Sequence, residues 1–230
     1  MKHAIRRLVR PLFLTSNTIR YRVELPRLRE ALSRIGMVEL AVDVGSAGGY
    51  YVTNAYAKYA SRLLAIEPDP QLCRLLASEI APLGKRASWR QGSILQLPLD
   101  SNLADVVTST QVLEHVEDDL RAMSELARVV KPNGYVLITV PQPPAPWPEG
   151  GHVREGYRIN DLVRLAEPQG LELLDHDYFL TLPTQRLCLL AHRFHERLPA
   201  LWPVREIMQS REERANEQPY GLLALFRKFA

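Results

Sequence analysis

Short apolar runs alternate along the chain with longer segments whose apolar residues recur at helical spacing. The run at residues 40–44 is short and favours a buried strand over a helix. Glycines follow at Gly45, Gly48 and Gly49, so the backbone can turn sharply there. Apolar residues in the stretch 52–59 then share one helical face. The pattern therefore predicts a strand, a glycine turn and a helix in succession.

The same alternation continues to the end of the chain. Asp69 is suited to cap the helix that follows the second strand, with Pro70 at its first position, and Asn160 to cap a later one. Strands separated by helices need crossover connections, which predicts an α/β fold with a mostly parallel sheet and helices on both faces. The expected strands are residues 40–44, 62–66, 86–90, 104–109, 135–140, 171–179 and 220–229.

Two helical segments lie outside this alternation. Apolar residues from Leu25 to Ile35 have helical spacing, and Pro26 is acceptable there if it lies in the first turn. A second helical pattern precedes the last strand. We expect four parts: residues 1–36 as an N-terminal basic and helical extension, 37–181 as the core, 182–218 as a helical insertion that forms a lid or binds an acceptor, and 219–230 as the last core strand.

Composition indicates one globular domain with a full core. The chain has 230 residues, of which 46% are hydrophobic and 24% charged. Disorder and membrane-spanning segments are not expected from such a chain. Cys73 and Cys188 lie far apart in apolar contexts, so neither a disulfide framework nor a metal site is expected. The protein is therefore expected in the cytoplasm.

Positive charge is concentrated at the start of the chain, although the formal net charge is only +3. Only Glu24 and Glu30 oppose this charge within the first thirty positions. Such an arm is either a solvated extension or a contact for an anionic membrane surface or an acidic partner. The basic residues are Lys2, Arg6, Arg7, Arg10, Arg20, Arg22, Arg27 and Arg29.

The turn after the first strand has the chemistry of an anion site. The unpaired N–H groups of a helix start favour a phosphate or carboxylate. A dinucleotide fold would need G-x-G-x-x-G, but position 47 is alanine, so neither Gly45 nor Gly49 anchors that spacing. The pattern Asp43-x-Gly45-x-Ala47-x-Gly49 instead resembles motif I of the class I S-adenosylmethionine-dependent methyltransferases, with alanine at the middle glycine.

Three later stretches resemble the same family, in the same order. Residues 92–98, GSILQLP, are similar to its G-D-x-x-x-L-P, with Ser93 in place of the aspartate. Residues 104–116 are similar to its fourth-strand sequence, and residues 125–141 to its E-x-x-R-V-L-K-P-G-G stretch. The resemblance covers about residues 40 to 180. It implies a Rossmann-like sheet of seven strands, the last antiparallel, and S-adenosyl-L-methionine as the cofactor.

The resemblance also implies which residues bind that cofactor. Glu67 ends the second strand, where the family's acid accepts hydrogen bonds from both ribose hydroxyls. Ser93 would accept a weaker hydrogen bond from the adenine amino group than an aspartate would. Ile94 would pack on the adenine face, and Gln111 lies where the methionine half and the acceptor should meet. The full set is Asp43, Gly45, Ser46, Ala47, Gly49, Glu67, Pro68, Gly92, Ser93, Ile94 and Gln111.

Methyl transfer needs mainly alignment of acceptor, methyl and sulfur, and a general base where the acceptor is a hydroxyl. His152 lies between the fifth strand and the next helix, where acceptors approach, and is the candidate catalytic base; a loop-ordering hydrogen bond is its alternative role. His115 follows Gln111 by about one helical turn and is expected to be structural or to face the cofactor. Trp147 and Tyr157 are expected in the acceptor wall.

The function expected is methyl transfer to a small molecule, most simply at an oxygen of a sugar, polyketide, quinone or lipid-linked precursor. Methylation at nitrogen or carbon is one alternative. A catalytically silent fold that serves as a partner or regulatory protein is another, and Ala47 and Ser93 both permit it. No nucleic-acid partner is expected, because no N-P-P-Y type tetrapeptide follows the fourth strand. Peripheral membrane contact stays open, and the sequence leaves the oligomeric state undetermined.

Overall fold

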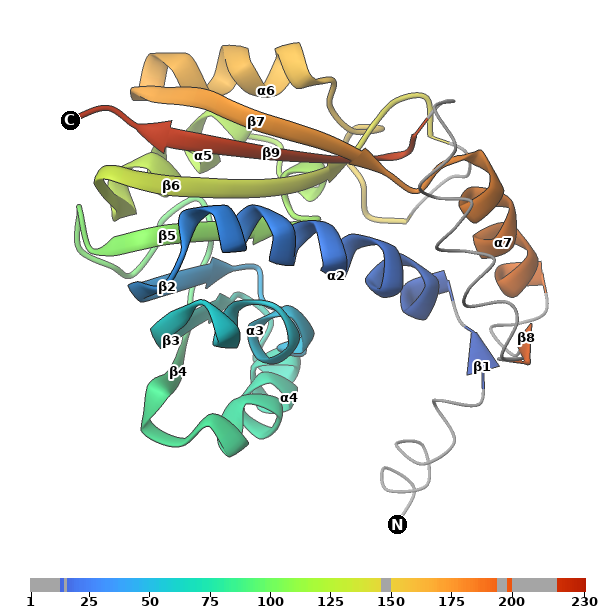
Figure 1. Ribbon diagram of the computed structural model, residues 1–230, viewed down its shortest axis with the longest axis horizontal. Coiled ribbons are helices and arrows are strands. Elements are labelled where there is room, and N and C mark those ends of the chain that lie inside the picture. Colours follow the sequence, from blue (N-terminus) through green and yellow to red (C-terminus); the bar gives the residue numbers. More distant parts are fainter. Residues whose placement is uncertain (1–12, 15, 146–149, 194–197, 200–218) are drawn as a thin grey trace.

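The computed structural model is built on one sheet of seven strands in the order β4-β3-β2-β5-β6-β9-β7 (Figure 1). It describes residues 13–14, 16–145, 150–193, 198–199 and 219–230. Strands β2 to β6 pair in parallel, and β9 runs antiparallel to both of its neighbours. The predicted fold class is therefore confirmed. The strands are β2 (Val38–Val44), β3 (Ala60–Glu67), β4 (Ala87–Gln91), β5 (Ala104–Thr110), β6 (Val130–Pro141), β7 (Leu171–Phe179) and β9 (Gly221–Lys228).

Helices cover both faces of the sheet (Figure 1). Helices α5 (Asp119–Val129) and α6 (Ile159–Ala166) bury apolar residues in one core. The other core receives the buried faces of α2 (Ser16–Ile35), α3 (Tyr50–Asn54), α4 (Pro70–Ile80) and α7 (Leu182–Arg193). Short 3₁₀ segments are η2 (Tyr56–Lys58), η3 (Ala81–Arg86), η4 (Leu113–His115) and η5 (Glu167–Gln169). A separate antiparallel pair joins β1 (Phe13–Leu14) to β8 (Leu198–Pro199).

The alternation of side chains along a strand divides these two cores. In β2, Val42 belongs to the core beneath α5 and α6, whereas its neighbour Ala41 belongs to the core beneath α2 and α4. Val107 and Val106 of β5 divide in the same way. Because successive strand residues point to opposite faces, a central strand that is covered on both sides is mainly apolar, and its few buried polar residues lie toward its carboxyl end. This explains why the central strands appear in the sequence as apolar runs and not as strict alternations.

Helix α2 begins earlier than the sequence pattern predicted. It runs from Ser16, so Pro26 lies inside the helix and not in its first turn. Ile19, Leu28 and Leu32 are buried in the same core as the sheet. Packing of an apolar face can offset the hydrogen bond that a proline removes from a helix interior. The N-terminal extension is therefore, in its described part, packed on the core.

The predicted start of one helix is confirmed, while the start of a second and the length of a third differ from the prediction. Asp69 caps α4 as expected and accepts hydrogen bonds from the N–H groups of Gln71 and Leu72, at 2.6 and 3.1 Å. The prediction that Asn160 caps the later helix is wrong, because Arg158 is the N-cap of α6. The helix after the glycine turn is short, since α3 gives way to η2.

Strand β6 begins before the predicted range 135–140 and contains a bulge. Ala104 pairs with Val130, but Val106 already pairs with Tyr135, so the intervening residues are extra within the strand. Asn133 has a φ of 63° there. Residues 131–134 therefore form a strand irregularity, as residues with a positive φ commonly do.

The glycine turn after β2 lies where the order of the sheet reverses between β3 and β5. Gly45 has a φ of 77°, and a Cβ placed there would lie 2.4 Å from Cγ2 of Val112. Its N–H and that of Ser46 donate to the carbonyl of Ile66, at 2.8 and 3.0 Å. Ala47 has a φ of 45°, a region that disfavours residues other than glycine. The alanine that departs from the family motif thus occupies a conformation that glycine would adopt more easily.

No described helix is long and apolar enough to cross a membrane. Three described arginines of the basic segment contact other elements of the fold. Arg20 donates to Gln111, Arg29 donates to the carbonyl of Asn54, and Arg27 pairs with Asp177 at 3.4 Å. Lys2, Arg6, Arg7 and Arg10 lie outside the described residues.

The glycine turn yields a test of stability. Gly45→Ala should lower the free energy of unfolding by about 2–4 kcal/mol, because the new Cβ meets Val112 and φ is positive. Ala47→Gly is the matched control: relief of the left-handed alanine offsets the greater freedom of the unfolded glycine, so stability should stay within about 1 kcal/mol. Urea unfolding measures both. Equal losses in the two variants would contradict this account of the turn.

Candidate functional site

The carboxyl ends of β2, β3 and β5 meet where the strand order reverses, and ligands bind beyond such ends in open parallel sheets. Gly45 to Gly49 follow β2, Glu67 ends β3, and Gln111 follows β5. The N–H of Gly49 donates to the carbonyl of Ser46 at 2.8 Å, which closes the turn ahead of α3. The predicted residues of the three strands are thus brought to one edge of the sheet.

Glu67 connects two of these segments through its buried carboxylate. Its Oε2 accepts a hydrogen bond from the N–H of Ala47 at 2.8 Å, and its Oε1 accepts one from the N–H of Asp69 at 3.0 Å. Only 4% of the residue is exposed. A carboxylate has about four lone-pair positions, so it can accept further hydrogen bonds from adjacent hydroxyls. This geometry suits a ligand that carries a vicinal diol.

Asp43 is a second buried carboxyl, one residue before the end of β2. Its Oδ1 accepts a hydrogen bond from the hydroxyl of Thr108 at 2.8 Å. Burial raises the pKa of the Asp43 carboxyl to about 6, while hydrogen bonds from Ser46 and Thr108 oppose the shift. The hydroxyl of Ser46 also donates to the backbone carbonyl of Asp43 at 3.0 Å. The group therefore changes charge close to neutral pH.

The stretch after β4 presents the residues expected near an adenine ring. The N–H of Gly92 donates to the carbonyl of Glu67 at 3.2 Å, and a Cβ on Gly92 would lie 2.6 Å from Pro98. Ser93 is exposed, and its hydroxyl accepts a hydrogen bond from the N–H of Leu95 at 3.2 Å. Ile94 is buried, with 7% exposed. Pro68 is exposed next to Glu67.

Helix α2 supplies site residues that the sequence reasoning missed. Glu24 is 1% exposed and accepts hydrogen bonds from the hydroxyls of Tyr51 and Thr139. Gln111 accepts a hydrogen bond from Arg20 and donates to the hydroxyl of Thr139 at 3.3 Å. Two of these contacts, Arg20 with Gln111 and Glu24 with Thr139, join residues 91 and 115 positions apart. In the sequence, the only local sign of a site role for Glu24 or Gln111 is that each is a polar residue beside apolar ones.

A stacked pair of tyrosines extends this contact. The ring of Tyr21 in α2 lies 4.2 Å from that of Tyr50 at the start of α3, with an angle of 17° between their planes. Tyr51 meets Tyr21 edge to face at 5.4 Å. Burial, with the adjacent Glu24 carboxylate, raises the pKa of Tyr51 well above its usual value, so its hydroxyl stays protonated and donates. Helix α2 thus borders the glycine turn.

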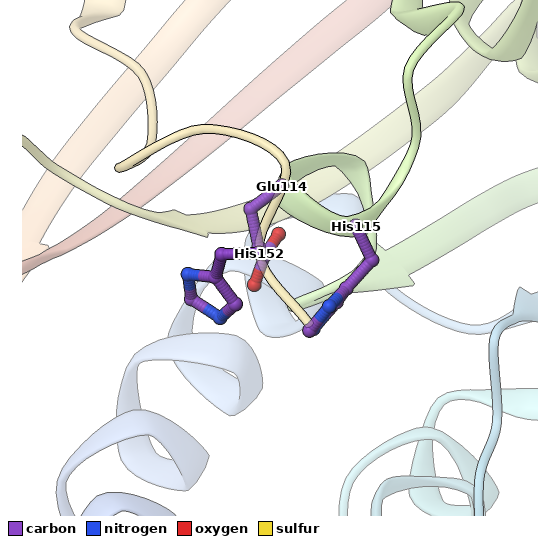
Figure 2. A group of neighbouring side chains, drawn as sticks. All are labelled: Glu114, His115 and His152. Carbon is purple, nitrogen blue, oxygen red and sulfur yellow. The ribbon is translucent and has the colours of Figure 1, made fainter. Parts of the chain in front are cut away.

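His152 lies beside two residues of η4 in the structure. Its ring meets that of His115 edge to face, with 4.6 Å between the ring centroids. Glu114 is fully buried next to both (Figure 2). Sequence reasoning treated the two histidines separately and did not consider Glu114. The fold brings all three to the carboxyl-end side of β5.

Tyr157 belongs to the scaffold behind this loop, so its expected place in an acceptor wall is wrong. It is 3% exposed and packs in the core. Its hydroxyl bonds to the carbonyl of Leu113 at 3.1 Å and to Asp119 at 3.0 Å, and accepts a hydrogen bond from Arg154 at 2.7 Å. Burial raises its pKa to about 12. Trp147 lies outside the described residues.

Residues 42–138 match a family model described as a methyltransferase domain. An uncharacterized methyltransferase from Mycobacterium leprae (strain Br4923) is 31% identical over 115 residues, which is 49% of this chain and 40% of that protein. The chain thus spans less than half of that relative's length.

Solved structures with the same fold are similar over most of this chain. The N-methyltransferase NodS from Bradyrhizobium japonicum, in complex with S-adenosyl-L-homocysteine, has a TM-score of 0.61 at 17% identity, covering 89% of this chain and 85% of that chain. The 4+2 cyclase SpnF has a TM-score of 0.64 at 19% identity, covering 89% and 81%. At such identities the likeness concerns the fold. The matched model therefore shows a methyltransferase domain at residues 42–138, and the solved structures support its fold.

Proposed function

We propose that this protein transfers a methyl group from S-adenosyl-L-methionine to an oxygen atom of a small-molecule acceptor. The observation that carries the proposal is the buried Glu67 carboxylate beside the N–H of Ala47, at the reversal of the sheet. That placement fits a ligand with an adjacent pair of hydroxyls, as the ribose of this cofactor has. The cofactor's sulfonium supplies the methyl group and its activation.

The proposed binding residues divide by the part of the cofactor that they would hold. The turn from Gly45 to Gly49 and the Asp43 carboxyl would border the amino-acid end, and Glu67 with Pro68 would hold the ribose. Gly92, Ser93 and Ile94 would border the adenine. The hydroxyl of Ser93 already accepts the N–H of Leu95, so any contact with adenine would be an additional one. Gln111 would contact the cofactor near the acceptor, held in place by Arg20 and Thr139.

His152 is the proposed proton acceptor for a hydroxyl. A lone pair of the acceptor oxygen forms the new bond to carbon, the pair of the broken carbon–sulfur bond stays on sulfur, and the hydroxyl proton passes to the imidazole. The buried Glu114 carboxylate beside it would stabilise the imidazolium that forms. Neutral histidine is suited to this role near physiological pH.

Two alternatives follow from specific observations. NodS is named an N-methyltransferase, and an amine acceptor would need no base at His152. SpnF is named a cyclase on the same fold, so the fold by itself does not require methyl transfer. A sugar, polyketide, quinone or lipid-linked precursor remains the proposed acceptor class. A screen of such compounds with methyl-labelled cofactor distinguishes methylation at oxygen, methylation at nitrogen and the absence of methyl transfer.

The Glu67 contact is tested by calorimetry. Glu67→Gln should weaken binding of S-adenosyl-L-methionine by about 10- to 100-fold, because it replaces charge-assisted hydrogen bonds with neutral ones. Glu172→Gln, at an exposed position of β7, is the matched control and should leave the affinity unchanged. Unchanged affinity in a folded Glu67→Gln protein would refute the assignment.

The Asp43 carboxyl predicts a pH dependence of cofactor binding. With a pKa of about 6, the group is neutral at pH 5 and anionic at pH 7. Because the cofactor carries positive charge, its affinity should rise as the pH increases from 5 to 7, by roughly 10-fold. In Asp43→Asn the affinity should be nearly constant over that interval. A wild-type affinity that falls with rising pH would contradict this prediction.

His152→Ala tests the proposed base. Turnover of a hydroxyl acceptor should fall by about 10²- to 10⁴-fold, while cofactor affinity is retained. His176→Ala replaces an exposed histidine on β7 and should leave turnover unchanged. Full activity of His152→Ala on the true acceptor would remove this residue from the chemistry and favour the nitrogen alternative.

A further inference from the structure

Glu114, His115 and His152 place three potential metal-ligand atoms close together. One carboxylate oxygen and one ring nitrogen from each histidine all lie within 4.8 Å of one another. Ligand atoms around an ion with bonds of about 2.0–2.2 Å stand roughly 3–3.5 Å apart. Small side-chain rotations would therefore close the set around an ion. Figure 2 shows the three side chains converging from η4 and the loop after β6.

The hydrogen bond of His115 favours a ligand role for that ring. Its Nδ1 lies 2.9 Å from the carbonyl oxygen of Gly151. A carbonyl oxygen only accepts, so Nδ1 carries the proton and Nε2 keeps its lone pair. Metal-binding histidines commonly donate their other N–H to a backbone carbonyl in this way. Gly151 is also the residue before His152, so one contact orients His115 and fixes the loop that carries its neighbour.

The loop is held against η4 by several further bonds. The N–H of Val153 donates to the backbone carbonyl of Glu114 at 2.9 Å. Arg154 donates to the carbonyls of Val116 and Glu117, both at 2.9 Å, and pairs with Asp119. His152 is therefore positioned next to Glu114 by contacts that do not use its own side chain. Such preorganisation is what a metal site requires of its scaffold.

Burial of Glu114 adds an electrostatic argument. The residue is 0% exposed, whereas His115 is exposed and His152 partly so. An ionised carboxylate is costly to bury unless positive charge lies close to it. A divalent ion between the three side chains would supply that charge, and the exposed side of the set would leave it open to a further ligand.

We propose that Glu114, His115 and His152 bind a divalent transition-metal ion. Two imidazoles and one carboxylate suit Zn²⁺, Fe²⁺, Co²⁺ or Mn²⁺ better than Mg²⁺ or Ca²⁺, which prefer oxygen ligands alone. Three protein ligands leave coordination positions for water or substrate. Sequence reasoning expected no metal site because it considered the cysteines and not this carboxylate with its two histidines.

The role of the ion rests on the proposed function. Glu114 and His115 follow Gln111 by three and four residues, so on the proposed function the open positions of the ion would bind an acceptor oxygen. The ion would lower the pKa of a coordinated hydroxyl, and the proton would pass to solvent. With the ion bound, the lone pair of His152 would be used by the metal and the histidine would position the ion; without the ion, His152 would accept the proton as proposed above. The acceptor class becomes one with an oxygen free to coordinate.

Direct metal binding tests the site without any acceptor. Protein stripped with a chelator and dialysed against Co²⁺ should retain about one ion per chain by elemental analysis and show visible ligand-field absorption. His115→Asn and His152→Asn should each weaken Co²⁺ binding by at least about 10-fold. His176→Asn is the matched control and should bind as the wild type does. His115 is exposed, so its substitution is the one that least endangers folding.

The outcomes separate this inference from the proposed function. Loss of Co²⁺ binding in His115→Asn and His152→Asn, with cofactor affinity retained, supports the metal site. Wild-type protein that binds no Co²⁺, or binds it equally well in both variants, overturns the site and leaves the proposed methyl transfer standing. Co²⁺ binding at these residues in a protein that binds no S-adenosyl-L-methionine would support the site and refute the proposed function.

Discussion

The geometry of this protein depends on one buried carboxylate. Glu67 ends β3 and accepts hydrogen bonds from the backbone of Ala47 in the turn after β2, and from that of Asp69, the cap of α4. Because both bonds go to backbone N–H groups, they constrain the course of the chain whatever the neighbouring side chains are. A turn, a strand end and a helix start are thereby held in one register. The residue proposed to hold the ribose is thus also the residue that shapes its surroundings.

Local sequence patterns were enough to predict most of the fold. Sequence patterns predicted all seven strands of the sheet, most clearly the central ones, because strands covered on both faces are mainly apolar. The cap at Asp69 was likewise predicted, because a side-chain oxygen and a following proline act within one turn. The predicted start of helix α2, at Leu25, is later than the observed start at Ser16, because polar residues interrupt the apolar pattern in its first turns. Its burial comes from α7 and β9, which lie at the far end of the chain.

The candidate site was predictable only in part, for the same reason. The glycine turn and Glu67 belong to contiguous motifs, so their proximity followed from strand order alone. Glu24 reaches Thr139 across more than a hundred residues, and no period or motif in the sequence relates the two. The group of Glu114, His115 and His152 likewise depends on the backbone bond from Val153 to Glu114. Sequence reasoning identified both histidines as notable but could not place them together.

The order of strands has a consequence for assembly. Strand β9 lies between β6 and β7, so β7 joins the sheet only through the final strand of the chain. As the polypeptide leaves the ribosome, residues 171–179 have no partner in the sheet until residues 221–228 have emerged. Strands β7 and β9 must then join the sheet at nearly the same time. Until they do, the edge of β6 is unpaired and exposed. An exposed edge of this kind is a template for wrong pairing, so the interval between the synthesis of β7 and that of β9 is the one in which this sheet most needs protection from its neighbours.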